Sequence, residues 1–344
     1  MSSQIIPNVN KNYLKNLFSQ IFSNPNSPIL RPDHRTPNQY REIKISRLTQ
    51  SFNSPINVNL GKTQIFSQIN AKLVSPKIER PSEGIINFQV DTHHLKPMAD
   101  FNSSNEALNE FRIAINTILE KCLKESHALD TNILCVIPGK IVYKITLEIN
   151  IIKHDGNVFD AAVIAALTSW LSFKIPFFRV KEGELYYDSF INLTTIHMPI
   201  CITHGIFLNK NKNEKIIFVL DNTLEEESVM SGSASICANI FGEISYMQMN
   251  TEAQISLGDM EELIGVMEKN VTFIHNKIKT FVEDENKRIE NIIKTLKISE
   301  KKDKIMENNN IEDNENEDNK KKILDMMEIE EKIEKSINIL EYKK

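Results

Sequence analysis

A turn within residues 151–171 contains the residue types of an anion-binding site. An apolar strand is followed by the turn His-Asp-Gly-Asn and then by an Ala-rich helix. The helix is expected to bury one stripe of side chains, since Val163, Ala166 and Trp170 recur at helical spacing. Asn157 is expected to cap the first turn with its side chain. A helix that starts beside a glycine can hold phosphate with its free amides, although such a turn can also serve packing alone.

Candidate metal ligands are few and badly placed. His93 and His94 are expected in a loop, because neighbouring side chains of an extended segment point to opposite faces. The four cysteines are widely spaced and include no C-x-x-C pair: Cys122, Cys135, Cys201 and Cys237. We expect reduced, buried thiols, no bound metal ion and no cofactor.

The composition is that of a globular protein. The chain has 344 residues, of which 41% are hydrophobic and 25% charged, enough for one large domain or two fused lobes. No apolar run is long enough to cross a bilayer, so no membrane partner is expected. The net charge of −5 argues against a protein that coats nucleic acid by bulk attraction. Local basic patches stay open, because the acidic C-terminal region dominates the sum.

Hydrophobic periodicity predicts two successive β-α units. The alternation of apolar residues over 58–74, with a Gly-Lys turn near its start, predicts a β-hairpin. The other elements of the first unit are strands at 84–90, 133–137 and 141–152, an amphipathic helix at 105–125 and the helix after Asn157. The second unit begins near residue 177 and has strands at 198–207, 216–221, 234–240 and 243–249, closed by a long helix at 257–282.

The two ends of the chain are predicted to lie outside this body. Residues 1–30 are rich in Asn, Ser and Pro around one short helical stretch, which indicates a mobile or partner-binding arm. Residues 283–344 form a low-complexity acidic tail, with disorder predicted at 308–319. An apolar stripe at 322–342 is typical either of a solvated, partly helical extension or of a terminal helix that docks on a neighbour.

Four blocks of sequence resemble, in the same order, the RNase PH-type ring subunits of the eukaryotic RNA exosome. They are residues 60–91, 128–140, 151–171 and 196–203, and the runs VSPKIERPSEG and HMPIC favour one ring subunit over its sisters. The run RPDHR at 31–35 resembles an RPDGR-like motif of the family, with His34 where Gly is usual. The resemblance covers 31–279. It implies an α+β, RNase PH-like (ribosomal protein S5 domain 2-like) fold with halves at 31–176 and 177–282.

The resemblance also indicates where phosphate-dependent RNA cleavage would take place. Active members carry a G-T-R run that holds phosphate at a helix start and a pair of Asp residues that bind metal or supply a proton. Here Val158 stands at the Thr position and Phe159 at the Arg position, while Glu227 and Ser233 stand at the two Asp positions. Phenyl and hydroxyl groups cannot replace a guanidinium and a carboxylate. The nearby acids Asp221, Glu225 and Glu226 are expected to cap a short helix and stay solvated.

Five basic residues are the candidate RNA contacts. Lys121 and Lys124 match basic positions that touch RNA in an inactive archaeal ring subunit, and their spacing predicts a shared helix face. Lys72, Lys77 and Arg80, around the run VSPKIER, are candidates of the same kind. An ordinary solvated surface is the alternative in both places.

The resemblance therefore implies a non-catalytic ring subunit. Its expected partners are other RNase PH-type subunits in an obligate hetero-oligomer, S1/KH-type cap subunits and single-stranded RNA, and its expected location is the nucleus, nucleolus and cytoplasm. One alternative is a phosphate-dependent 3′-exoribonuclease, which the missing G-T-R run and second Asp disfavour. Another is a stand-alone RNA-binding module, disfavoured by the net charge and the absence of an aromatic stacking motif.

Overall fold

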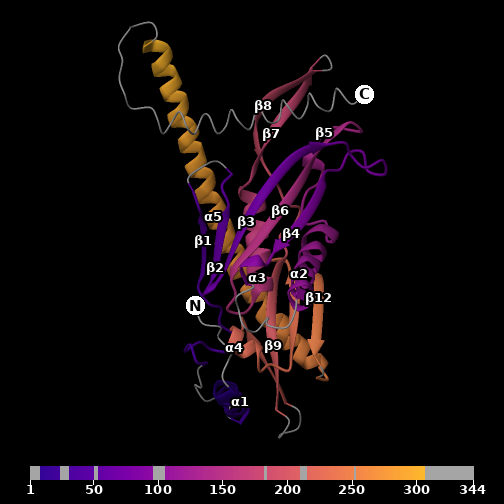
Figure 1. Cartoon of the computed structure of the whole chain (residues 1–344), viewed down its shortest axis with the longest axis vertical. Coiled ribbons are helices and arrows are strands. Elements are labelled where there is room, and N and C mark those ends of the chain that lie inside the picture. The colour runs from indigo at the N-terminus through magenta and orange to yellow at the C-terminus, as the bar shows by residue number, and fades with distance from the viewer. Residues whose placement is uncertain are drawn as a thin grey trace.

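The computed structural model describes residues 8–23, 31–49, 53–95, 105–181, 184–209, 215–251 and 253–306. Two β-sheets flank the central helix α3, and the long helix α5 runs along one side of the molecule (Figure 1). The expected α+β class is confirmed. No helix in the described ranges is long and apolar enough to cross a membrane.

The first sheet has the strand order β1-β2-β3-β6-β4, with β5 paired to β6. Its elements are β1 (Ile43–Arg47), β2 (Ile56–Leu60), β3 (Thr63–Val74), β4 (Ile85–Asp91), α2 (Asn105–Leu119), β5 (Cys135–Ile137), β6 (Ile141–Lys153) and α3 (Val158–Ser172). The predicted hairpin at 58–74 is confirmed, because Leu60 pairs with Thr63 across the turn. β4 runs parallel to β6, and α2 lies between them in the chain, as a parallel connection requires.

The second sheet is antiparallel throughout, with the strand order β10-β9-β11-β12. It consists of β9 (Ile200–Asn209), β10 (Lys215–Leu220), β11 (Gly232–Ala238) and β12 (Ile244–Thr251), with α4 (Leu224–Glu227) after β10. A hairpin of β7 (Lys174–Lys181) and β8 (Glu184–Asn192) connects the two sheets in the chain. All four strands predicted for the second half are present within two residues of their expected starts.

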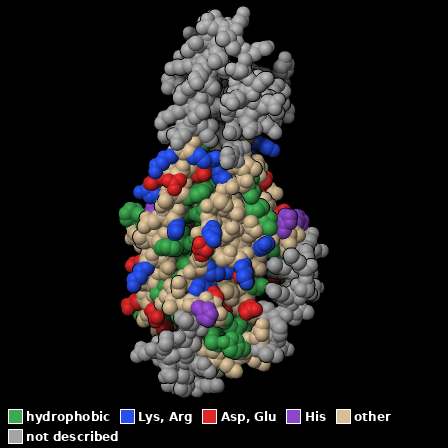
Figure 2. Space-filling model, turned by 90° about the vertical axis from the view of Figure 1, so that its left-hand side faces the viewer, with side chains coloured by type: hydrophobic (Ala, Val, Ile, Leu, Met, Phe, Trp, Pro, Cys, Tyr) green, Lys and Arg blue, Asp and Glu red, His purple; other side chains and the backbone are tan. Residues whose placement is uncertain are grey.

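Charged side chains of both signs are interspersed on the face drawn in Figure 2. Neither basic nor acidic side chains gather there into a single large patch, as a surface that coats nucleic acid would require. An RNA-binding surface on this face would therefore have to be local.

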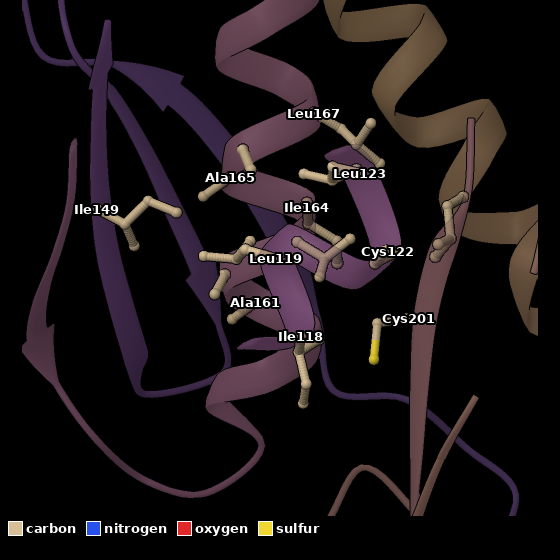
Figure 3. Packing of buried hydrophobic residues seen from close by; sticks show 14 of the residues in the cluster. Ile118, Leu119, Cys122, Leu123, Ile149, Ala161, Ile164, Ala165, Leu167 and Cys201 are labelled. Carbon is tan, nitrogen blue, oxygen red and sulfur yellow. The ribbon is translucent and has the colours of Figure 1, made fainter. Parts of the chain in front are cut away.

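Helix α3 departs from the sequence prediction. One buried stripe of side chains was expected, but the helix is buried on nearly all sides. Only Phe159 and Leu171 of its 15 residues are partly exposed. The helix contacts β2 and β3 on one side and β9 and α5 on the other, and the C-terminal part of α2 packs across it (Figure 3). Small residues such as Ala161 and Ala165 allow this close approach, and a helix apolar on every side is stable only in such an interior.

The two ends of the ordered body are longer than predicted. Helix α1 (Asn8–Ser23), expected in the mobile arm, packs Leu14 and Phe18 against the second sheet, and the rings of Phe18 and Phe207 stack with centroids 4.0 Å apart. Helix α5 (Leu257–Met306), expected to end at 282, continues because Ile289 is buried and Glu285 pairs with Arg47. Residues 1–7, 24–30 and 307–344, with the predicted disorder and terminal helix, lie outside the described residues.

Candidate functional site

The side chain of Arg41 fixes the turn between β6 and α3 by hydrogen bonds. Its guanidinium donates to the carbonyl oxygens of Asp155 (2.7 Å) and Gly156 (3.1 Å), and Thr63 donates to the same Gly156 oxygen at 2.7 Å. Gly156 has a φ of +86°, and a Cβ there would lie 2.3 Å from the carbonyl oxygen of Asn222. The turn therefore requires glycine and has one fixed geometry.

Asp221 is the centre of a buried ionic network under this turn. Its carboxylate accepts hydrogen bonds from Arg35 (3.0 Å), from Arg41 (2.8 and 2.9 Å for the guanidinium) and from the side-chain amide of Asn157 (2.8 Å). Despite burial, these donors hold the pKa of Asp221 below its ordinary value. The prediction that Asp221 is solvated is wrong, because the guanidinium groups come from residues about 180 positions away in the chain.

Glu226 is also buried, contrary to the prediction. Arg31, which is fully buried, forms an ion pair with it and donates to the carbonyl oxygens of Leu220 (2.8 Å) and Asp221 (2.9 Å). The predicted capping role is confirmed, since Thr223 and Glu226 form a reciprocal capping box at the start of α4. Glu225, in contrast, is exposed as predicted. His34 has a φ of +63°, which explains why glycine suits its position in the resembling motif.

The side chain of Asn157 does not cap α3 as predicted. Asn157 precedes the helix in the left-handed conformation (φ 52°), and its side chain makes no capping hydrogen bond. Instead its amide nitrogen donates to Asp160 and to Asp221, both at 2.8 Å. The two buried carboxylates therefore determine its orientation.

Sequence analysis did not find Asp160, which links α3 to the second sheet. Its carboxylate accepts from the hydroxyl of Tyr40, from the Thr203 hydroxyl (2.8 Å) and from the Thr203 amide (3.1 Å). Burial raises the pKa of Asp160 to about 6. The available signal was an acidic residue inside an otherwise apolar helix, a placement that burial allows only with partners.

The four positions inferred from the resemblance line a single cavity of about 200 Å³. Val158, Phe159, Glu227 and Ser233 reach it from α3, α4 and β11. The cavity is also lined by a buried group, His154, Asn157, Thr203 and Asn222, and by partly exposed Phe111 and Met230. That these four residues stand where relatives carry out catalysis stays a prediction.

The two titratable groups among the described residues that line this cavity are a carboxyl group and a neutral imidazole. Burial raises the pKa of Glu227 to about 7, and burial together with Arg41 lowers the pKa of His154 to about 4. His154 Nδ1 accepts from the Gly156 amide at 3.2 Å, so the neutral ring carries its proton on Nε2, which lies 3.9 Å from Glu227 Oε2. The Asn157 amide donates to Glu227 Oε1 at 2.7 Å. The carboxyl group of Glu227 thus accepts the hydrogen bond of a backbone amide at the start of α3, an amide that could otherwise donate to a bound anion.

Three of the five candidate RNA contacts lie along a second, more open groove of about 360 Å³. Lys77, Arg80 and Lys124 line it together with His127 and with Glu79 and Glu83. Arg80 forms an ion pair with Glu83 at 3.0 Å, which offsets part of the positive charge. The groove joins the loop after β3 to the end of the helical segment that starts with α2.

Lys121 and Lys72 lie apart from this groove. The prediction that Lys121 shares a face with Lys124 fails, because Glu120–Glu125 form a π-helical turn, whose wider spacing rotates the two side chains away from each other. Lys121 instead pairs with Glu125 at 3.3 Å. Lys72 is exposed on β3, where its cross-strand partner is Lys144.

Candidate metal ligands do not converge within the described ranges. No group of three or more His, Cys, Asp or Glu side chains there could hold a metal ion. His93 and His94 lie in a short 3₁₀ turn at the surface. The four cysteines are free thiols, and all except Cys135 are buried.

Two comparisons define the class of protein. Residues 32–176 match the family described as 3′ exoribonuclease family, domain 1, and residues 197–270 match its domain 2. The chain belongs to this RNase PH family of 3′ exoribonucleases. The predicted resemblance is thereby confirmed.

Several curated relatives of the chain are exosome complex components of the RRP45 type. The chain is 33% identical over 66% of its length to exosome complex component RRP45A of Arabidopsis thaliana, of which it covers 73%. It is 34% identical over 63% of its length to exosome complex component RRP45 of Danio rerio and of Homo sapiens, covering 54% and 48% of them. The chain thus spans about half the length of these vertebrate relatives.

Solved structures share the fold. One described as an archaeal exosome core matches with a TM-score of 0.62 at 20% identity, covering 79% of this chain and 97% of that chain. Another, the Archaeoglobus fulgidus exosome with RNA bound to the active site, matches with a TM-score of 0.64 at 21% identity, covering 78% and 98%.

Proposed function

We propose that this chain is a non-catalytic RNase PH-like ring subunit of an RNA exosome. It completes the ring and guides RNA 3′ ends for the processing and decay of rRNA and mRNA elsewhere in the complex. Its RRP45 relatives and the archaeal exosome structures support the ring assignment. The observation that carries the non-catalytic part is the cavity at the start of α3, where Phe159 and the Glu227 carboxyl group stand in place of an anion site.

The chemistry of that cavity disfavours the alternative, a phosphate-dependent exoribonuclease. Phosphate binding needs amide donors together with a guanidinium or an ammonium group. The described residues that line the cavity include no Lys or Arg, and the Asn157 amide already donates to Glu227. A phosphate ion entering the site would also face the carboxyl group of Glu227. Such a cavity repels the reagent that the reaction consumes.

The groove of Lys77, Arg80 and Lys124 supports contact with RNA. Cations spaced along a groove neutralise successive phosphates of a single strand, with an affinity that depends on salt. Two glutamates in the same groove limit the net charge, so we infer weak, sequence-independent guidance and not tight capture.

The free edge of the second sheet supports pairing with a neighbouring RNase PH-type subunit. β12 ends the strand order, and the turn that leads into it carries Phe241 with 79% of its surface exposed and Ile240 with 42%. An edge strand beside exposed apolar side chains favours association. We further propose contacts with S1/KH-type cap subunits and a location in the nucleus, nucleolus and cytoplasm, as the resemblance to exosome ring subunits implies.

Co-expression tests the ring assignment. The full chain should be poorly soluble alone and should form a soluble heterodimer with an RNase PH-type ring subunit, since interfaces of obligate partners bury about 2,000 Å² or more. Phe241→Glu should reduce the yield of heterodimer, whereas Phe273→Glu, at a comparable exposed aromatic on α5, should not. A stable, monodisperse monomer that does not bind the co-expressed partner would overturn the assignment.

A further inference from the structure

The cavity at the start of α3 has a closed floor and an open rim. His154, Asn157, Val158, Thr203 and Asn222, all buried, form the floor, and partly exposed side chains form the rim: Phe111, Phe159, Glu227, Met230 and Ser233. Its volume of about 200 Å³ is smaller than the roughly 300 Å³ at which pockets for drug-sized ligands begin. A ligand of this cavity is therefore a single flat ring system or something smaller.

Two buried side-chain oxygens of the floor lack hydrogen-bond partners among the described residues. Because the Asn157 nitrogen donates to two carboxylates, its oxygen is fixed as the acceptor, and within the described residues that oxygen has no hydrogen-bond partner. The side-chain oxygen of Asn222 is buried and without a partner in the same sense. Buried acceptors of this kind are costly unless something donates to them.

The rim adds an acceptor and apolar surfaces. Glu227 uses Oε1 for the Asn157 amide and carries its second oxygen beside the cavity, where His154 lies 3.9 Å away. Phe159 and Phe111 supply aromatic rings, and the ring of Phe111 lies 5.4 Å from that of His154. Aromatic walls around a few directed polar groups are the arrangement by which proteins hold an unstacked base.

We propose that this cavity binds a nucleobase that carries an exocyclic amino group. Guanine, adenine and cytosine each carry an exocyclic amino group, whereas uracil carries two carbonyl oxygens and no amino group. The amino group would donate to the second oxygen of Glu227, and the ring would lie against Phe159. Phosphate is an anion, and no Lys or Arg is among the described residues that line the cavity. The inference concerns this chain alone and does not depend on its membership of a ring.

Photo-cross-linking with 8-azidoadenosine tests the proposal on the full chain, alone or with a co-expressed partner. We expect the cross-link, located by mass spectrometry, on peptides of this chain that contain Phe111, Phe159 or Met230. Adenosine, guanosine and cytidine should compete for it at concentrations about tenfold lower than uridine, and inorganic phosphate should not compete. No cross-link on these peptides, or equal competition by uridine or phosphate, overturns the proposal.

Two variants and one control identify the contacts. Phe159→Ala should reduce cross-linking about tenfold through loss of stacking, whereas Phe273→Ala on α5 should leave it unchanged. Glu227→Gln retains the size of the side chain but turns a donor toward the ligand, so uridine should compete as well as adenosine. If Phe159→Ala fails to fold, the Glu227→Gln variant by itself tests the proposal. An unchanged preference among the bases in that variant contradicts the assignment.

Discussion

The cavity at the start of α3 and the basic groove beside β4 use the same fold in opposite ways. The cavity is supported by a buried ionic network of Arg31, Arg35 and Arg41 with Asp221 and Glu226, yet it contains no cation. The groove has its cations on exposed segments, where Arg80 pairs with Glu83 at the surface. The comparison teaches that rigid positioning and anion affinity are separable. Here the buried ionic network positions the residues of the cavity, and the cations that could bind an anion lie at the surface in the groove.

The largest expected effect concerns the network under the cavity. Asp221→Ala should lower the free energy of unfolding by about 3–5 kcal/mol, because the guanidinium groups of Arg35 and Arg41 remain buried without their carboxylate. Urea unfolding measures it. Glu225→Ala, at an exposed acid in α4, is the control and should change stability by less than about 0.5 kcal/mol. A small effect of Asp221→Ala would mean that the network does not support the turn.

A second prediction uses the raised pKa of Glu227. Its folded pKa of about 7 lies above the ordinary value of 4.5, so its contribution to stability is complete below pH 4.5 and is lost as pH rises through 7. Glu227→Gln does not ionise. The variant should therefore gain stability relative to the natural protein as pH rises from 4.5 to 7, by up to about 1.4 kcal/mol per pH unit.

Chemical denaturation across that pH range, on both proteins side by side, gives the difference. The buried His154 is present in both, so its opposite pH dependence cancels to first order. A difference that does not change with pH would show that the carboxyl group is solvated and that the cavity is less closed than described.

The smallest expected effect concerns the groove. Replacing Lys77 and Lys124 by Glu should weaken binding of single-stranded RNA to the assembled ring by about tenfold. It should also reduce the slope of log affinity against log salt by about 0.7 for each RNA phosphate that is no longer neutralised. Lys121→Glu, outside the groove, is the matched control. If Lys121→Glu has the larger effect, RNA follows the side of the π-helical turn that carries Lys121 instead.

The local sequence pattern predicted the secondary-structure elements, whereas the burial of polar side chains depends on tertiary contacts. Alternation at 58–74 was enough for the hairpin, because its partners are adjacent in the chain. The burial of Asp221 and Glu226 was not predictable from their neighbours, since the arginines that permit it lie near residues 31–41. The π turn at Glu120–Glu125 carries no clear local signal, and it separated Lys121 from Lys124.

The sequence predicted which residues lie at the candidate site, but it did not predict their hydrogen bonds and burial. The resemblance brought Val158, Phe159, Glu227 and Ser233 to one place, and the structure places all four around one cavity. Nothing in the sequence showed that Glu227 would accept a hydrogen bond from the helix start, or that Asn157 would bind carboxylates in place of capping. These features depend on how α4 packs against the turn.

Phosphorolysis is the most direct test of the central claim that this cavity does not support catalysis. The full chain, assembled with a partner inactivated at its own site, is incubated with single-stranded RNA and inorganic phosphate, and nucleoside diphosphates are measured. We expect no release above a control without protein, because the Phe159 ring and the Glu227 carboxyl group offer the attacking anion no positive charge. Phosphate-dependent release of nucleoside diphosphates by this assembly would contradict it.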